Sequence, residues 1–183
     1  MPKGAIEKTD AWLRDWVIEL NLCPFARHPY EQGKVDIVTT QQTDVESVFR
    51  FVLSELDRLQ QTSPEELETA LLVIENGLVA FDDYLDFLEL IESAVSESGL
   101  QGIIQIASFH PQYCFDAVSE DDPANFTNRS PFPMFHLIRE ESLEKAVASY
   151  PEPEKIPQRN IALLREMGIT EILKRYRNIL GLQ

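Results

Sequence analysis

The chain has 183 residues, of which 44% are hydrophobic and 26% charged, and its formal net charge is −15. This length and composition predict one domain, spanning residues 1–183, with a core of its own. The charge argues against a nucleic-acid partner, because acidic surfaces repel phosphate backbones and the sequence holds no basic stripe of useful size. No apolar run approaches the roughly 18 residues of a membrane span and no targeting segment is recognisable, so we expect a cytoplasmic protein without a membrane partner.

The negative charge is concentrated in residues 41–100, which contain 14 acidic side chains against Arg50 and Arg58. A solvated acidic face that favours solubility is one interpretation. The other is a docking surface for a basic protein partner. Cys23 and Cys114 are too few for a disulfide framework, and we expect both to be reduced.

The first predicted helix begins at Thr9, which is a suitable N-cap, and ends near Asn21, because Pro24 follows. Its apolar residues fall at helical spacing on one face; they are Trp12, Leu13, Trp16, Val17 and Leu20. Residues 35–40, VDIVTT, are rich in β-branched side chains and predict a strand.

A Thr-x-x-Glu capping box at Thr43 and Glu46 predicts the start of a second helix. Residues 63–66 predict only one short turn, and ALLVIE (70–75) predicts a strand buried on both faces. Phe81 to Glu97 is a further amphipathic helix with Gly99 as its stop, and its predicted inward side chains are Leu85, Leu88, Ile91 and Val95. Residues 102–109 predict a third strand.

The resulting order is α-β-α-β-α-β, then a long loop, then a fourth strand over 134–140 beside the third. Helical connections favour parallel strands, so the predicted fold is an α/β protein with a small, mostly parallel sheet of three to four strands packed with helices. Residues 141–183 predict a C-terminal helical segment packed on this domain. Within it, one helix ends at Gly168 and a last helix begins at Thr170.

The loop from Phe109 to Pro133 is unusually long for a compact domain and is rich in aromatic rings. We expect it to be ordered, to fold over the carboxyl ends of the strands and to wall a ligand pocket there. His110 and His136 stand at its two ends, and they are candidates for a catalytic acid–base pair or for two metal ligands. The alternative is one buried structural histidine and one surface histidine.

Arg129 and Arg139 in the same region are candidates to hold an anionic group, because a guanidinium binds carboxylate or phosphate with two parallel hydrogen bonds. Internal ion pairs are the alternative in a chain with 31 acidic residues. Further candidate ligand-binding residues are Asn128, Ser130 and Tyr113, although the asparagine also suits a turn.

Cys23 is a candidate nucleophile or pocket wall, but its place after the first helix, near the negative end of the helix dipole, disfavours a thiolate. A buried structural cysteine is the alternative, and the Cys23–Pro24 dipeptide is a weak signal for haem. No spacing among Cys23, His110 and His136 matches a zinc motif, so a metal site is a weak alternative. The sequence has no P-loop, GxGxxG, HExxH or CxxC pattern, and the cofactor remains unknown.

Four segments resemble a bacterial family known as domain of unknown function 1415. They are WLRDWVIELNLCPFA (12–26), FHPQY (109–113), NFTNRSPFPMFHLIREES (125–142) and IPQRNIALLREMG (156–168). The resemblance implies a small, single-domain protein and carries no established activity. It covers Cys23, Pro24, His110, Pro111, Asn128, Arg129, Ser130, Pro131, His136, Arg139 and Glu140, whereas Cys114 departs from the family pattern.

Three functions fit these observations. The first is an enzyme that acts on a small anionic molecule, with His110 and His136 as acid and base, Arg129 binding the anion and Cys23 nearby. The second is a non-catalytic adaptor that docks a basic protein through residues 41–100. The third is a metal or haem protein that uses Cys23, His110 and His136.

Overall fold

The computed structural model describes residues 4–181. Six α-helices, four strands and three short helices of other types follow one another in these residues: α1 (Ala5–Trp12), the π-helix η1 (Leu13–Ile18), α2 (Arg27–Glu31), β1 (Val35–Thr40), α3 (Val45–Gln61), β2 (Thr69–Ile74), α4 (Phe81–Glu97), β3 (Ile104–Phe109), the 3-10 helix η2 (Pro123–Thr127), β4 (Met134–Arg139), α5 (Glu140–Ser149), the 3-10 helix η3 (Pro153–Lys155) and α6 (Ile156–Leu180). The predicted strands and the four longest predicted helical regions are all present.

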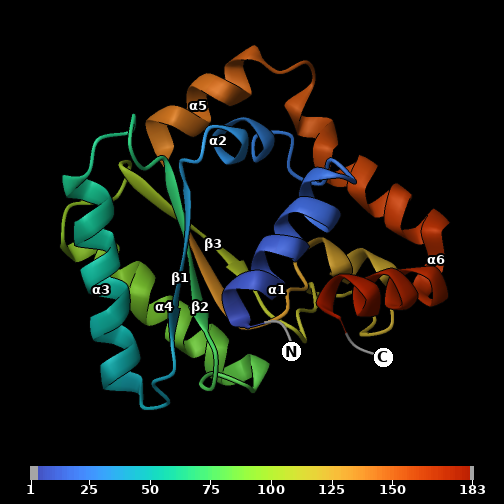
Figure 1. The fold of residues 1–183 in the computed structure, drawn as a ribbon, viewed down its shortest axis with the longest axis horizontal. Coiled ribbons are helices and arrows are strands. Elements are labelled where there is room, and N and C mark those ends of the chain that lie inside the picture. Colours follow the sequence, from blue (N-terminus) through green and yellow to red (C-terminus); the bar gives the residue numbers. More distant parts are fainter. Residues whose placement is uncertain (1–3, 182–183) are drawn as a thin grey trace.

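The four strands form one mixed sheet in the order β1-β2-β4-β3 (Figure 1). Strands β1 and β2 are parallel, whereas β4 is antiparallel to both β2 and β3. The prediction of a mostly parallel sheet is therefore wrong. The connection between β3 and β4 contains no crossover helix, so the chain re-enters the sheet at the same end of the strands from which it left, and β4 runs in the opposite direction between β2 and β3.

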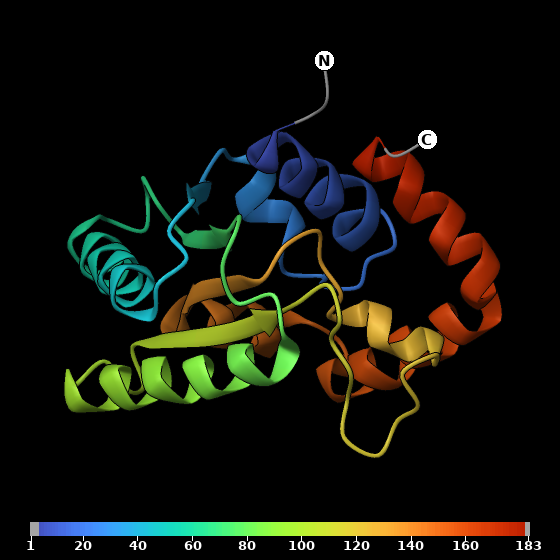
Figure 2. The ribbon, with the colours of Figure 1, turned by 90° about the horizontal axis from the view of Figure 1, so that it is seen from below.

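Helices α3 and α4 cover one face of the sheet (Figures 1 and 2). Their apolar stripes meet alternate residues of the strands, because successive strand side chains point to opposite faces. The largest buried groups on this side are Leu59, Leu72, Ile74, Tyr84, Ile91, Ile104, Phe135 and Leu137. On α4 the buried positions are Tyr84, Phe87, Ile91 and Val95, and the predicted inward Leu85 is exposed.

Helices α1, η1 and α6 lie on the opposite face, together with η2 from the long loop (Figure 1). Trp12 and Trp16 are the centre of this second core and are almost completely buried. Their indole N–H groups donate to the backbone carbonyls of Arg129 and Phe126, at 3.1 Å in each case. The two tryptophans thereby attach the long loop to the first helix as well as filling the core.

Two helix starts differ from the sequence prediction. Helix α1 begins at Ala5 with Gly4 as N-cap, and Thr9 lies in the middle of the helix, where it is buried. Helix α3 is capped by Asp44 rather than by Thr43, because the Asp44 carboxylate accepts the backbone N–H of Ser47 at 2.9 Å. A carboxylate at the N-cap satisfies an otherwise free amide and also interacts favourably with the helix dipole.

The C-terminal segment is bent at Gly168, as its sequence predicted. Gly168 has φ 74° and ψ 154°, a conformation that L side chains avoid, and it divides α6 into two helical parts. Helix α6 packs against η2 and α1. Among the helices of residues 4–181, none is long and apolar enough to cross a membrane.

Candidate functional site

A pocket of about 710 Å³ lies on the α1 side of the sheet, between the sheet, the segment from Cys23 to Val35 and helix α5. Its floor comes from the start of β2 and the end of β4, and α2 and α5 flank it at the top of Figure 1. The pocket is mostly apolar, with a few polar groups at one end. The residues that matter for its chemistry are Cys23, Lys34, Glu68, Thr69, His136 and Lys145.

His136 is the central polar group of this pocket. Its Nε2 lies 2.6 Å from the hydroxyl of Thr69, and that hydroxyl lies 2.5 Å from the carbonyl oxygen of Leu137. The carbonyl can only accept, so the single hydroxyl proton goes to Leu137, and Nε2 of His136 must be the donor to Thr69. This assignment places the proton of the neutral imidazole on Nε2, and Nδ1 carries a lone pair that has no hydrogen-bond partner within residues 4–181.

Burial lowers the pKa of His136 from 6.5 to about 4, because the charged imidazolium loses its hydration inside the protein. The ring is therefore neutral at pH 7. A neutral imidazole with a fixed tautomer and an unused Nδ1 is chemically competent to accept a proton from a molecule bound in the pocket.

Cys23 also lines the pocket, in the turn that follows η1. Burial raises the pKa of its thiol, and the backbone amides of Phe25 and Ala26 only partly oppose this effect. The group is therefore a thiol at pH 7, as the sequence context indicated. The structure brings Cys23 and His136 to the same pocket, and the nucleophilic role predicted for Cys23 stays a prediction.

His110 does not lie in this pocket, and the predicted approach of the two imidazoles does not occur. His110 is fully buried on the α4 side, where its ring contacts Phe81 and Tyr84. Its Nδ1 accepts the backbone N–H of Gln112 and its Nε2 donates to the carbonyl of Leu78, both at 3.0 Å. Both ring nitrogens are thus used by the backbone, which leaves neither free for a ligand in this conformation.

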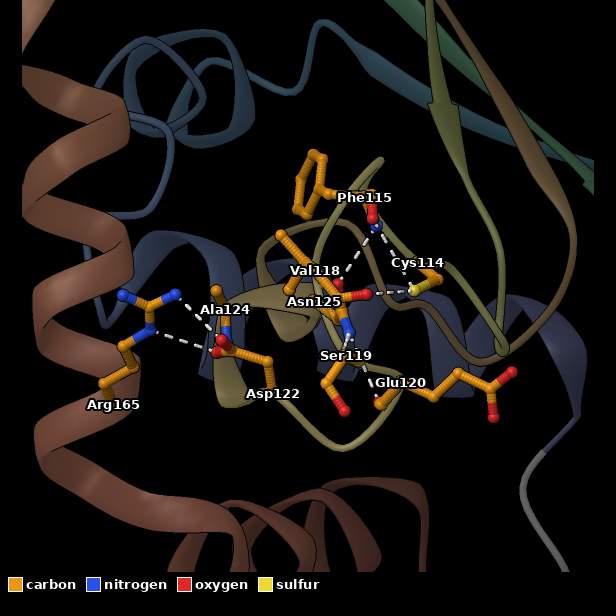
Figure 3. A network of polar contacts seen from close by, with 9 residues as sticks. All are labelled: Cys114, Phe115, Val118, Ser119, Glu120, Asp122, Ala124, Asn125 and Arg165. Atoms are coloured by element: carbon orange, nitrogen blue, oxygen red, sulfur yellow. Dashed lines mark hydrogen bonds and ion pairs between the residues drawn. The ribbon is translucent and has the colours of Figure 1, made fainter.

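The long loop is ordered, as predicted, but polar contacts with its own backbone hold it (Figure 3). The buried amide of Asn125 accepts from the N–H of Phe115 at 3.1 Å and donates to the carbonyls of Ser119 and Glu120 at 2.8 and 3.2 Å. At the loop's outer edge, Arg165 of α6 forms two hydrogen bonds with the Asp122 carboxylate, the shorter 2.8 Å long.

Arg129 also stabilises the conformation of this loop. Its guanidinium donates to the carbonyls of Tyr113 and Glu120, at 3.1 and 2.8 Å, and lies 4.8 Å from the centre of the Phe126 ring. A smaller hollow of about 510 Å³ is lined by Arg129 and by Asp82 and Glu120. These two carboxylates disfavour an anion in that hollow, and Arg129 does not reach the larger pocket.

Arg139 caps the end of helix α3. Its guanidinium donates to the carbonyls of Leu59, Thr62 and Leu67 at 2.5 to 3.3 Å, so the positive charge meets the negative end of the helix dipole.

The other predicted ligand-binding residues have internal contacts as well, with the backbone for Asn128 and Ser130 and with other rings for Tyr113. The Asn128 amide donates to the carbonyl of Ser108, the Ser130 hydroxyl donates to the carbonyl of Phe132, and the ring of Tyr113 packs on Phe81 and Phe115.

Metal ligands are not grouped within residues 4–181, where no three His, Cys, Asp or Glu side chains are placed to hold one ion. The three candidate metal ligands from the sequence do not meet. Cys23 and His136 share the pocket, whereas His110 lies on the other face of the sheet.

The fold and the pocket together define an α/β protein with a four-stranded mixed sheet and a largely apolar ligand-sized pocket on a face of that sheet. A family model described as "Protein of unknown function (DUF1415)" matches residues 4–174. The chain belongs to this family, which confirms the resemblance seen in its motifs. No curated protein and no solved structure matches the chain.

Sequence reasoning missed Lys34, Glu68 and Thr69, which supply most of the polar end of the pocket. One signal was present: Thr69 is a polar residue that directly precedes the apolar run of β2. A hydroxyl at the start of a buried strand needs a partner, and here the partners are His136 and Leu137.

Proposed function

We propose that the protein is an enzyme that binds a small organic molecule in the large pocket, with His136 as the proton acceptor. The observation that carries this proposal is the free Nδ1 of a neutral imidazole whose tautomer is fixed by Thr69. The supporting features are the size of the pocket, which suits a small ligand, and its mostly apolar lining, which suits an organic molecule. His110 is not part of this proposal, because its two ring nitrogens are engaged.

Occupation of the pocket can be tested by filling it. Ala146 lines the pocket, whereas Ala148 of the same helix is exposed and lies outside it. We expect Ala146→Trp to abolish binding of the neutral fluorophore N-phenyl-1-naphthylamine and Ala148→Trp to leave it unchanged. Equal binding to both variants would place the probe elsewhere and remove the support for this pocket.

Proton abstraction can be tested without knowledge of the complete reaction. We expect the protein in D2O to catalyse C–H exchange in at least one member of a panel of small carbonyl compounds and organic acids, followed by NMR. His136→Gln should slow this exchange by about 10²- to 10⁴-fold, the usual contribution of a general base. Thr69→Val should reduce the rate less, because this variant keeps the imidazole and loses only the hydrogen bond that fixes its tautomer. Exchange that persists in a folded His136→Gln variant would refute the assigned role.

A further inference from the structure

We infer that the pocket selects organic anions with an apolar body, and that Lys34 binds the anionic group. This inference rests on the proposed function, because it names the class of ligand for the same pocket. It assigns a role to a residue that stands outside every motif of the sequence.

Lys34 is an unpaired cation in the pocket wall. Within residues 4–181 its ammonium has no hydrogen-bond or ion-pair partner, whereas Lys145, the other lysine of the wall, lies 2.6 Å from the carboxylate of Glu141. The Lys34 ammonium is therefore available to a ligand, although the chain has 31 acidic side chains against 16 basic ones.

The backbone places Lys34 next to the proposed base. The carbonyl of Lys34 accepts the N–H groups of Glu68 and Thr69, at 2.9 and 3.3 Å. The side chain of Thr69 in turn holds His136. An anion bound by Lys34 therefore lies at the end of the pocket where the imidazole is, and the flexible four-carbon stem of lysine allows the ammonium to follow the ligand.

Lys34 is the lysine of the pocket lining that remains available to an anion, because Lys145 is paired with Glu141 and His136 is neutral at pH 7. The carboxylate of Glu68, which also lines the pocket, repels an anion. Removal of the Glu68 charge therefore gives the inference a second test, with an expected effect opposite to that of removing the Lys34 charge.

The body of the ligand is expected to be apolar. The part of the wall formed by α1, η1 and the sheet includes six large apolar side chains, namely Trp12, Leu13, Val17, Leu71, Phe109 and Ile138. Burial of apolar area supplies affinity without direction, whereas one charge contact fixes the orientation of the ligand. A carboxylate or sulfonate attached to a ring or chain meets both requirements.

Two fluorescent probes isolate the contribution of the charge. 8-Anilinonaphthalene-1-sulfonate and N-phenyl-1-naphthylamine share one ring system, and only the first carries a sulfonate. We expect Lys34→Gln to weaken binding of the sulfonate about fivefold or more, the size of one partly shielded charge contact, and to change binding of the neutral probe less than twofold. Lys155→Gln is the matched control, because it removes the same charge from an exposed site outside the pocket.

The remaining outcomes separate this inference from the proposed function. Glu68→Gln should strengthen binding of the sulfonate and leave the neutral probe unchanged, and this holds even if Lys34→Gln proves unstable. If Ala146→Trp blocks both probes but Lys34→Gln and Glu68→Gln affect them equally, the pocket is real and the anion preference is refuted. If wild-type protein does not bind the sulfonate, or Ala146→Trp blocks neither probe, the inference fails, and in the latter case the evidence for the pocket fails with it.

Discussion

At the scale of single residues, His136 couples the pocket to the stability of the protein. Its pKa is about 4 in the folded state and near 6.5 when exposed, so between these values the unfolded chain binds a proton that the folded chain does not. The contribution of His136 to the free energy of unfolding should therefore be fully present above pH 6.5. It should be lost as the pH drops to 4, which lowers the free energy of unfolding by on the order of 2–3 kcal/mol. Burial also lowers the pKa of His110, which adds a loss in the same direction.

Urea denaturation at pH 7 and at pH 4.5 measures this effect. We expect His136→Gln to lose distinctly less stability between the two pH values than wild type, because the variant has no imidazole to protonate at that position. An identical loss in the two proteins would show that His136 does not keep its low pKa.

Arg139 is expected to be the arginine whose loss harms the fold most. Arg139→Ala leaves the carbonyls of Leu59 and Thr62 at the end of α3, and that of Leu67 before β2, without this donor, and we expect a loss of about 2–4 kcal/mol. Arg50→Ala is the matched control, because its exposed pair with Glu46 contributes at most about 1 kcal/mol. Urea denaturation compares the two, and equal small losses would contradict the capping role.

The placement of the two histidines shows where prediction from sequence ends. Phe109 is paired with Met134, so these two side chains lie on one face of the sheet. His136 is two residues from Met134 and shares that face, whereas His110 is one residue from Phe109 and points to the other. A shift of one residue in register would have reversed this result, and nothing local in the sequence fixes the register.

At the scale of elements, the loop between β3 and β4 behaves as a folded unit. Asn125 supplies three hydrogen bonds from a fully buried amide, all to backbone groups of the loop. We expect Asn125→Ala to accelerate amide hydrogen exchange across residues 111–129 by at least tenfold while the exchange of β2 is little changed. Asn76→Ala is the control, because that side chain is exposed and makes one long hydrogen bond of 3.5 Å. Uniform acceleration over the whole chain would show that the loop is not an independent unit.

The elements themselves were largely predictable, because periodicity and stop signals are local. Helix α4 has the predicted bounds, and β2 is buried along its whole length as its apolar run indicated. The direction of β4 could not be predicted from local sequence, because it depends on the end of the strands at which the long loop lies. His110 fixes that end through its bond to Leu78, just beyond β2.

The larger pocket was missed for a related reason. It is formed by segments that are distant in the sequence, namely residues 23–35, the start of β2, the end of β4 and α5. None of them carries a recognisable motif at its polar end, whereas the ring-rich loop, which has the clearest sequence signal, lies at the other end of the strands. The sequence did identify Cys23 and His136, but a pocket is defined by which side chains meet, and that required the tertiary arrangement.

At the scale of the whole molecule, the sheet separates two layers with different tasks. The α3 and α4 side is a continuous apolar core, whereas the opposite side combines a core around Trp12 and Trp16 with the pocket. The acidic residues of 41–100 fall largely on the outer surfaces of α3 and α4, away from the pocket. A basic protein partner on that surface stays a prediction, and it would leave access to the pocket open.

The position of β4 also has a consequence for how the protein is made on the ribosome. The strand that stands between β2 and β3 is the last of the four to be synthesised. Until residue 139 has left the exit tunnel, β2 and β3 each lack a neighbour, and their backbone amides and carbonyls are open to wrong partners. A nascent chain that stalls after β3 would therefore be held in an aggregation-prone state, and completion of a single six-residue segment ends that exposure.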